Sequence, residues 1–273
     1  MTADDPVALG GVPETMLWTL HNRASEAARP DAFLRDDDAV RIYRSIPYDY
    51  RRSFGKPDGS HAARSRIFDD ALRPWLASHP GAAVVELGAG LETQFRRVDN
   101  GSVRWLCVDV PEAIAVRERF LPPTDRCRHL AVSALDPAWI DAVDASRPVF
   151  VTAQGLFMYF EESDVARLIG AIATRLAGAE LMFDAIPPWF SRKTLRGTNK
   201  TPHYQVPPMP WGVNRNEIEP LLRIWAPNIA SVAQVPFGYQ RGLAGALLPV
   251  ISRTPGLRNL LPTIARVRTA ATQ

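Results

Sequence analysis

Two glycines, one residue apart, follow a short apolar run in the segment Val84–Thr93, which reads Val-Val-Glu-Leu-Gly-Ala-Gly-Leu-Glu-Thr. A buried strand that ends in Gly-x-Gly lets the backbone turn sharply and brings its N–H groups close to a ligand. Asp109 follows about twenty residues later, at the end of a second apolar run, where a ribose-binding carboxylate is expected. These residues predict a nucleoside-containing cofactor at the edge of an α/β sheet.

The residues around the glycines narrow the class of cofactor. A dinucleotide fingerprint requires a third glycine, which packs helix against strand, and Thr93 stands at that position. Glu86 fits an S-adenosylmethionine (SAM) site better, because its carboxylate can orient the loop and face a cationic methionine moiety. It could equally accept hydrogen bonds from the loop N–H groups without touching a ligand. The pattern therefore favours SAM over NAD or FAD.

Two aspartates follow the next apolar runs. Asp109 could accept hydrogen bonds from both ribose hydroxyls, and Asp136 could accept one from the adenine amino group. Both could instead cap helices, because Pro111 and Pro137 open helices nearby. Since ligands bind outside the carboxyl ends of parallel strands, these side chains are expected to converge.

The elements that must position these residues alternate between strand and helix after residue 82, which predicts a parallel sheet with helices on both faces. The expected strands are Ala83–Leu87, Val103–Val108, Arg128–Val132, Pro148–Thr152 and Ala179–Ala185, and the expected helices between them include Pro111–Leu121 and Glu161–Leu176. Before the sheet, the sequence predicts a loose tail over residues 1–12 and helices over Pro13–Arg29, Asp36–Ser45 and Ser60–Ser78, with Ser60 as a cap and a polar turn over Pro47–Gly59.

The regular alternation stops at residues 186–213. This stretch is rich in proline and has little periodicity, so we expect an irregular lid. Beyond it, Asn214 is expected to cap a helix that ends at Trp225. Ile229–Val235 and Ile264–Arg268 are expected to pair as antiparallel edge strands, with a short helix or loop over Leu243–Ile251 between them.

Composition excludes several classes of protein. With 273 residues, 46% hydrophobic and 22% charged, the chain can bury a core without disulfides or metal. A net charge of +3, with acids interspersed and no basic cluster among aromatics, argues against a nucleic-acid partner. Cys107 and Cys127 are expected to be buried thiols, with no metal site. There is no signal pattern and no apolar run of about 18 residues, so we expect a cytoplasmic protein with no membrane partner.

Four segments, in order, resemble one family. Residues 86–96 (Glu-Leu-Gly-Ala-Gly-Leu-Glu-Thr-Gln-Phe-Arg) resemble the Gly-Ala-Gly-Leu-Asp-Thr-Arg signature of the leucine carboxyl methyltransferase family, and most of all its tetracenomycin-type polyketide O-methyltransferase branch. Residues 63–69 resemble the family's Arg-Thr-Arg helix, residues 108–112 its Asp-x-Pro step, and residues 153–160 its Ala-Glu-Gly-Leu-Leu-Met-Tyr-Leu segment. The similarity extends from about Glu14 to Gly238.

The resemblance implies a class I SAM-dependent methyltransferase, which converts SAM to S-adenosylhomocysteine. Its fold would be a Rossmann-like sheet over residues 80–273, with an N-terminal helical cap over residues 1–79. The resemblance implies that Arg64 binds the SAM carboxylate and Gln154 its amino group. Glu86, Gly88 and Gly90 would form the turn that admits the cofactor. Asp109 would bind the ribose, and Leu135 and Asp136 the adenine. Gln154 replaces a glutamate of the family pattern, so this contact should weaken. Glu92 and Gln94 replace Asp and Arg in the signature.

Methyl transfer from SAM needs little more than correct positioning, because the leaving group is already good. A carboxylate acceptor needs no base, whereas a phenol or alcohol can need one. The candidate bases or acceptor partners are His203, Tyr204 and Tyr159, although the aromatic residues of the lid could serve only for packing. Met158, Tyr159, Phe183, Trp189 and Phe190 could line an aromatic substrate or belong to the core.

The resemblance therefore predicts an O-methyltransferase that acts on a carboxylate or phenol of a small polyketide-like or aromatic metabolite. Three alternatives stay open, namely methylation of a protein C-terminal carboxylate, a SAM-binding protein without catalysis, and an NAD oxidoreductase. The sequence leaves the oligomeric state open.

Overall fold

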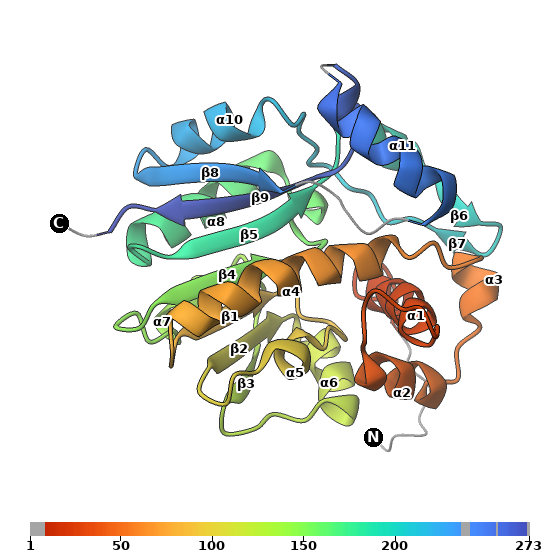
Figure 1. Cartoon of the computed structure of the whole chain (residues 1–273), viewed down its shortest axis with the longest axis horizontal. Helices are drawn as coiled ribbons and strands as arrows, with labels where there is room; N and C mark the ends of the chain where they lie inside the picture. The colour runs from red at the N-terminus through yellow and green to blue at the C-terminus, as the bar shows by residue number, and fades with distance from the viewer. Residues whose placement is uncertain (1–8, 236–240, 255, 272–273) are drawn as a thin grey trace.

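A seven-stranded sheet forms the centre of the molecule (Figure 1). We describe it from a computed structural model that defines residues 9–235, 241–254 and 256–271. The strand order is β3-β2-β1-β4-β5-β9-β8, and β9 runs antiparallel to both of its neighbours. The strands are β1 (Ala83–Leu87), β2 (Arg104–Asp109), β3 (Cys127–Ala131), β4 (Val149–Ala153), β5 (Glu180–Ala185), β8 (Ile229–Val235) and β9 (Thr263–Thr269). The parallel sheet and the antiparallel pair after it are confirmed.

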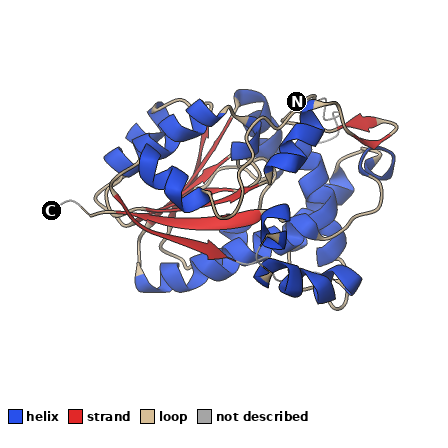
Figure 2. Ribbon diagram, turned by 90° about the horizontal axis from the view of Figure 1, so that it is seen from above, coloured by secondary structure: helices blue, strands red, loops and turns tan. Residues whose placement is uncertain are grey.

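Helices cover both faces of the sheet, as the view from above shows (Figure 2). One face packs against α4 (Ser60–Ser78) and α5 (Gln94–Val98) through apolar side chains such as Phe68 and Trp75. The other face packs against α7 (Ala138–Asp141), α8 (Glu162–Arg175) and α10 (Ile218–Trp225). Every residue of β1 and β4 is buried, which is why these strands read as continuous apolar runs.

The N-terminal helices lie beside the carboxyl ends of the parallel strands. They are α1 (Thr15–Ala27), α2 (Asp37–Ser45) and α3 (Tyr50–Phe54), and they form one apolar cluster with Leu91 and with α6 (Pro111–Phe120). Helix α3 lies where a polar turn was expected, and Asp49 caps it by accepting a hydrogen bond from the N–H of Arg52. The bounds of α4 agree with the expectation, but its cap is Gly59 in the left-handed region, not Ser60. The tail expected over residues 1–12 lies mostly outside the described residues.

The expectation that residues 186–213 are irregular was wrong. Residues 186–213 contain helix α9 (Pro188–Leu195), which starts at a proline suited to the first helical position, and a hairpin of β6 (Asn199–Thr201) and β7 (Tyr204–Gln205). Asn214 does not cap α10, which begins at Ile218; its amide instead donates to Glu217. Helix α11 (Gly242–Arg253) and the short 3-10 turns η1 (Phe157–Tyr159) and η2 (Leu257–Leu260) complete the chain.

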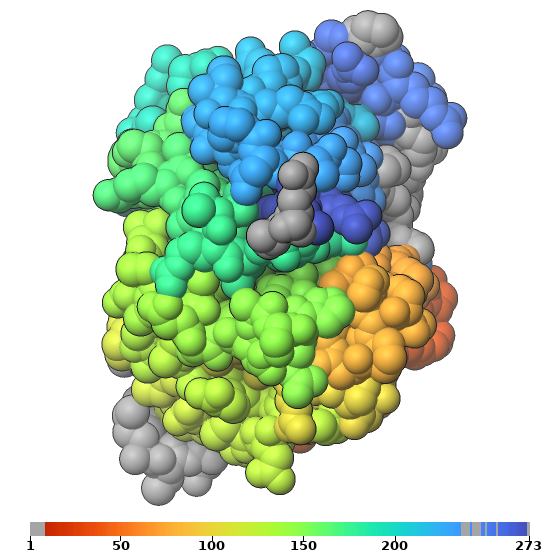
Figure 3. Space-filling model, turned by 90° about the vertical axis from the view of Figure 1, so that its left-hand side faces the viewer, coloured from red at the N-terminus to blue at the C-terminus, as the bar shows by residue number. Residues whose placement is uncertain are grey.

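Different elements cover the two ends of the sheet. Figure 3 views the molecule from the side away from the N-terminal helices, which are almost hidden there. At the opposite end of the sheet, α1 packs against Leu91, just beyond the carboxyl end of β1. Within the described residues, no helix is both long enough and apolar enough to cross a bilayer.

Candidate cofactor site

A cavity of about 280 Å³ lies at the carboxyl ends of the parallel strands. The ends of β1, β2 and β4, the segment after β3 and the start of α1 all contribute to its lining. Strand order reverses between β1 and β4, and such a switch point is the usual ligand site of an open α/β sheet. The chain thus places a cavity of suitable size for a small cofactor where its topology predicts one.

The glycine turn after β1 forms one wall of this cavity. Gly88 and Gly90 both have positive φ, 67° and 42°. A Cβ on Gly88 would lie 2.9 Å from Leu156 Cδ1, and one on Gly90 would lie 3.1 Å from Met16 Cβ. Both positions therefore need glycine for conformation and for space, and the close contacts bring α1 and the segment after β4 against the turn.

Asp109 fixes the glycine turn through two hydrogen bonds to backbone N–H groups. Its Oδ2 accepts a hydrogen bond from the N–H of Gly90 at 2.8 Å, and its Oδ1 accepts one from the N–H of Val110 at 2.8 Å. Burial raises the pKa of Asp109, and these two N–H donors offset part of that effect. Each carboxylate oxygen keeps acceptor capacity, and the residue lines the cavity. Asp109 therefore orients the turn and presents acceptors to a ligand.

Replacing Asp109 by alanine is expected to weaken SAM binding at least tenfold, because it removes charged acceptors worth about 1.5–3 kcal/mol each and frees the Gly90 N–H. Calorimetry with SAM and with methylthioadenosine, which lacks the amino-acid end, measures the effect. Both ligands should lose affinity, since both carry the ribose. Unchanged affinity for methylthioadenosine would contradict a ribose contact.

Arg64 reaches the cavity from α4, at the side of β4 and β5. Its Nη1 donates to Asp184 Oδ2 at 3.0 Å, and Asp184 Oδ1 accepts from the N–H of Gly155 at 2.6 Å. A Cβ on Gly155 would lie 2.5 Å from Arg64 Nη1, so glycine there makes room for the guanidinium. Arg64 is almost fully buried but still lines the cavity. The arginine expected to meet a carboxylate is thus fixed beside the glycine turn.

Glu86 is more deeply buried than expected for a carboxylate that faces a cationic ligand. Its Oε2 accepts from the Trp105 indole N–H at 3.1 Å, and burial raises the pKa of Glu86 well above its usual range. Its Oε1 has no partner among the described residues, although Glu86 borders the cavity. Burial therefore disfavours the charged form of Glu86, while Arg117 Nη2, 3.9 Å from Glu86 Oε2, favours it. Oε1 is the atom left to form a hydrogen bond with a ligand.

Arg117 supports the turn, and the sequence interpretation missed it. Its Nη1 donates to the carbonyl oxygens of Ala89, Gly90 and Glu92 at 3.3, 2.9 and 2.7 Å. The signal was present in the sequence, because Arg117 falls three residues after Ile114 on the buried face of α6. An arginine on an apolar helix face usually has a buried partner, and here the partners are three carbonyl groups.

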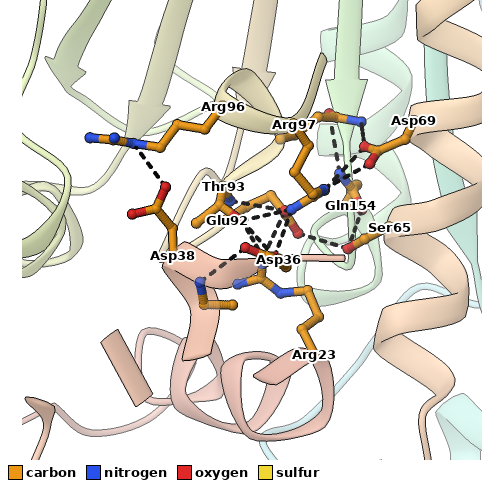
Figure 4. A network of polar contacts seen from close by, with 12 residues as sticks. Arg23, Asp36, Asp38, Ser65, Asp69, Glu92, Thr93, Arg96, Arg97 and Gln154 are labelled. Atoms are coloured by element: carbon orange, nitrogen blue, oxygen red, sulfur yellow. Dashed lines mark hydrogen bonds and ion pairs between the residues drawn. The ribbon is translucent and has the colours of Figure 1, made fainter. Parts of the chain in front are cut away.

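Gln154 lines the cavity and belongs to a buried polar network (Figure 4). Its Nε2 donates to Gln94 Oε1 at 3.3 Å, and Gln94 Nε2 donates to Asp69 Oδ1 at 3.0 Å. The Ser65 hydroxyl lies 3.4 Å from Gln154 Oε1 but donates over the shorter distance of 2.8 Å to Glu92 Oε2. The amide nitrogen of Gln154 therefore points to Gln94, and its oxygen is the atom left to accept a hydrogen bond from a ligand.

The network continues into four charged groups between α1, α2 and the turn. Arg97 contacts Asp69, Asp36 and Glu92 at 2.7, 2.9 and 2.7 Å, and Arg23 contacts Asp36 and Glu92 at 3.2 and 2.7 Å. Burial acts to raise the pKa of Glu92, but Arg23 and Arg97 outweigh it, so the net pKa is lowered. Glu92 thus stays ionised and ties the turn to the N-terminal helices.

Gln94 and Gln154 are two positions at which this chain departs from the family pattern, and they contact each other. We expect Gln154→Glu to strengthen SAM binding, because it offers the charged acceptor of the family pattern to the SAM amino group, and Gln94→Arg alone to weaken SAM binding, because it adds a cation near that group. In the double variant the two new charges face each other, so its effect should differ from the sum of the single effects by about 1 kcal/mol or more. Calorimetry on the four proteins measures this coupling, and additive effects would contradict it.

Four expected site residues lie outside the cavity lining, namely Leu135, Asp136, His203 and Tyr204. Ser133 and Ala134 line it instead. Asp136 is exposed and accepts a hydrogen bond from the N–H of Ala138 at 2.9 Å, but the N-cap position of α7 is Pro137, so Asp136 is not its cap.

The three candidate bases have different surroundings. His203 is exposed at the turn of the β6–β7 hairpin, and Tyr204 is buried against Trp18 and Phe54. Burial raises the pKa of Tyr204, and its hydroxyl has no partner among the described residues. Tyr159 does line the cavity, and burial raises its pKa to about 12. A phenol with that pKa stays neutral near pH 7, so it can donate a hydrogen bond but is a poor base.

Most of the aromatic residues considered for the substrate wall belong to packing clusters. Phe183 is fully buried, and Met158 packs with Ile186 and Val206. Trp189 is 44% exposed, and its indole N–H donates to the carbonyl oxygen of Leu260. Of the residues proposed for that wall, Tyr159 borders the described cavity.

Comparisons with known proteins agree with this geometry. A sequence model of the leucine carboxyl methyltransferase family matches residues 4–173. The chain is 35% identical to the tetracenomycin polyketide synthesis O-methyltransferase TcmP of Streptomyces glaucescens, over 72% of this chain and 76% of that protein. It is 28% identical to the S-adenosyl-L-methionine-dependent methyltransferase dpfgK of Gibberella zeae, over 66% of this chain and 67% of that protein.

Solved structures share the fold. A candidate methyltransferase from Thermobifida fusca superposes with a TM-score of 0.55 at 17% identity, covering 92% of this chain and 94% of that one. The CurJ carbon methyltransferase superposes with a TM-score of 0.52 at 12% identity, covering 95% of this chain and 68% of that one. At these identities the likeness concerns the fold alone.

Proposed function

Because this chain belongs to the leucine carboxyl methyltransferase family, we propose that it methylates an oxygen of a small polyketide-like or other aromatic metabolite. The protein is a SAM-dependent methyltransferase with a Rossmann-like class I fold. One observation carries the site proposal: the glycine turn, Asp109, Arg64 and Gln154 all border a single cavity at the switch point of the sheet.

Each end of this cavity suits one part of SAM. Arg64 would bind the carboxylate of the methionine moiety, and Gln154 Oε1 would accept from its amino group. Asp109 would accept from the ribose hydroxyls, and the segment at Ser133 and Ala134 would border the adenine in place of Leu135 and Asp136. Two further observations support the fit of SAM to this cavity. Glu86 Oε1 has no hydrogen-bond partner among the described residues, and Gly88 and Gly90 have no side chains that would fill the space. SAM supplies a methyl group on a sulfonium, which leaves as a neutral thioether.

The acceptor that best suits this cavity is a carboxylate. Tyr159, with a pKa of about 12, is a poor base, and His203 lies away from the cavity. A phenol has a pKa near 10 and must lose its proton, whereas an aromatic carboxylate is already ionised at neutral pH. The chain then needs to hold the carboxylate oxygen in line with the methyl group and exclude water. Tyr159 could donate a hydrogen bond that orients it.

Competition within one molecule tests this proposal. An aromatic acid that carries both a carboxyl and a phenol is offered with SAM labelled in its methyl group. We expect the label in an ester, which alkali releases as methanol, and a rate that changes less than twofold between pH 7 and pH 9. Blocking the carboxyl should abolish turnover.

Three other results would contradict the proposal. An alkali-stable ether with a rate that rises about tenfold per pH unit would identify a phenol as the acceptor. Turnover of a peptide with a free C-terminal carboxylate, and of no small acid, would identify a protein substrate. Saturable SAM binding with no turnover of any acceptor would support the non-catalytic alternative.

A further inference from the structure

Two thiols and an imidazole meet on one face of the sheet, outside the lining of the cofactor cavity but with Cys107 Sγ 3.6 Å from Glu86 Oε2. Cys107 on β2 pairs with His129 on β3, and Cys127 lies two residues before His129 on the same face. The Sγ atoms of Cys107 and Cys127 are 3.8 Å apart, and the ligand atoms of all three residues lie within 4.8 Å of one another. Cys107 is fully buried, and Cys127 is almost so.

A second cavity, of about 400 Å³, reaches this cluster. Cys127 and His129 both line it, and Thr124, Asp99 and Arg96 form part of its wall. The cluster is therefore buried on the side of the sheet core but accessible to a small ion through this cavity.

We propose that Cys107, Cys127 and His129 bind a thiophilic divalent cation such as Zn²⁺, with a fourth position open to the second cavity. Two sulfurs bound to one tetrahedral zinc at about 2.3 Å lie about 3.8 Å apart, which is the separation found here. Two thiolates and one imidazole are ligands that zinc prefers, and an open fourth position can hold water.

A disulfide suits this geometry less well. The two sulfurs would have to approach from 3.8 Å to about 2.05 Å. Cys107 and Cys127 occupy diagonal positions on neighbouring parallel strands, about 4.8 Å apart across the sheet and two residues, about 6.6 Å, apart along it. Because a disulfide requires closer backbones, the sheet would have to distort, whereas a shared cation leaves both sulfurs where they lie.

The charges near the cluster are compatible with a cation only if the thiols lose their protons. Two thiolates neutralise a dication. Burial raises the pKa of Cys107, whereas the hydrogen bond between the two thiols lowers the pKa of Cys127, and Arg117 acts to lower both pKa values. Glu86 Oε2 lies 3.6 Å from Cys107 Sγ. Arg117 Nε also donates to His129 Nε2 at 3.3 Å, and His129 Nδ1 faces Glu118 at 3.2 Å. Metal binding must therefore displace one of these contacts, and its affinity should increase with pH.

Cobalt titration of the full chain, without SAM, tests the site. We expect Co²⁺ to produce thiolate charge-transfer absorption and the visible bands of a tetrahedral complex, both removed by excess Zn²⁺. Zn²⁺ should also raise Tm and protect both thiols from alkylation, because it binds the native state. Mg²⁺ should do neither, since it prefers oxygen ligands.

Two variants and one control locate the ligands. Cys127→Ser and His129→Gln should each weaken Co²⁺ binding at least tenfold, whereas His203→Gln, at an exposed histidine, should leave it unchanged. If Cys127→Ser does not fold, Co²⁺ binding by His129→Gln and thiol protection in the unmodified chain still test whether the cluster binds the metal. Absence of the charge-transfer band, or its full retention in His129→Gln, would overturn the proposal. These readouts do not depend on methyl transfer, so they stand or fall apart from the proposed function.

Discussion

Replacing Arg64 by leucine is expected to weaken SAM binding about a hundredfold or more. The variant loses a charge-assisted contact to the SAM carboxylate, worth about 1.5–3 kcal/mol. It also leaves Asp184 without the guanidinium that contacts it at 3.0 Å. The uncompensated carboxylate of Asp184 would then repel the carboxylate of SAM, and a hundredfold loss corresponds to about 2.8 kcal/mol.

A ligand that lacks the amino-acid end separates this effect from damage to the cavity. Calorimetry should show that Arg64→Leu binds methylthioadenosine as tightly as the unmodified chain does, because that ligand never meets Arg64. Arg64→Lys, which keeps the charge but not the planar donor pair, should lose less affinity for SAM. Equal losses for SAM and methylthioadenosine would contradict the assigned contact.

Replacing Arg97 by leucine is expected to destabilise the protein by about 3–5 kcal/mol, because it breaks buried ion pairs and leaves carboxylates uncompensated. Arg97 is the shared partner of Asp69, Asp36 and Glu92, and Asp69 is fully buried (Figure 4). Burial already raises the pKa of Asp69, and Arg97 offsets part of that effect. Urea unfolding measures the change in the free energy of unfolding.

The neighbouring arginine provides a matched control. Arg96 is 43% exposed and lies 3.5 Å from Asp38, so Arg96→Leu removes the same kind of side chain from a solvated pair. Its expected cost is within about 1 kcal/mol. If the two variants were equally stable, the buried network would contribute nothing to the fold.

The sequence was a good guide where local chemistry decides the structure. Apolar runs predicted the strands, and the glycine turn with Asp109 predicted the side of the sheet that carries the cavity. Positive φ and close contacts explain why glycines mark that turn. The helix α3 and the β6–β7 hairpin were missed, because their short segments have too few residues to show a period.

Contacts between distant residues could not be predicted in this way. The contact of Arg117 with three carbonyl groups depends on how α6 packs against the turn. Likewise, the pairing of Gln94 with Gln154 joins residues 60 positions apart. Asp136 follows β3 as expected, yet its side chain is exposed and accepts a hydrogen bond from the N–H of Ala138.

The position of α1 has a consequence for protein engineering. Thr15, Met16 and Thr19 border the cofactor cavity from this helix, while Arg23, two turns after Met16, binds the carbonyl oxygen of Leu91 at 2.6 Å. Helix α1 therefore carries both residues that line the cavity and the arginine that fixes the helix to the glycine turn. A combinatorial library limited to Thr15 and Thr19 would change one wall of the cavity while leaving the sheet, the glycine turn and the anchoring arginine in their natural form.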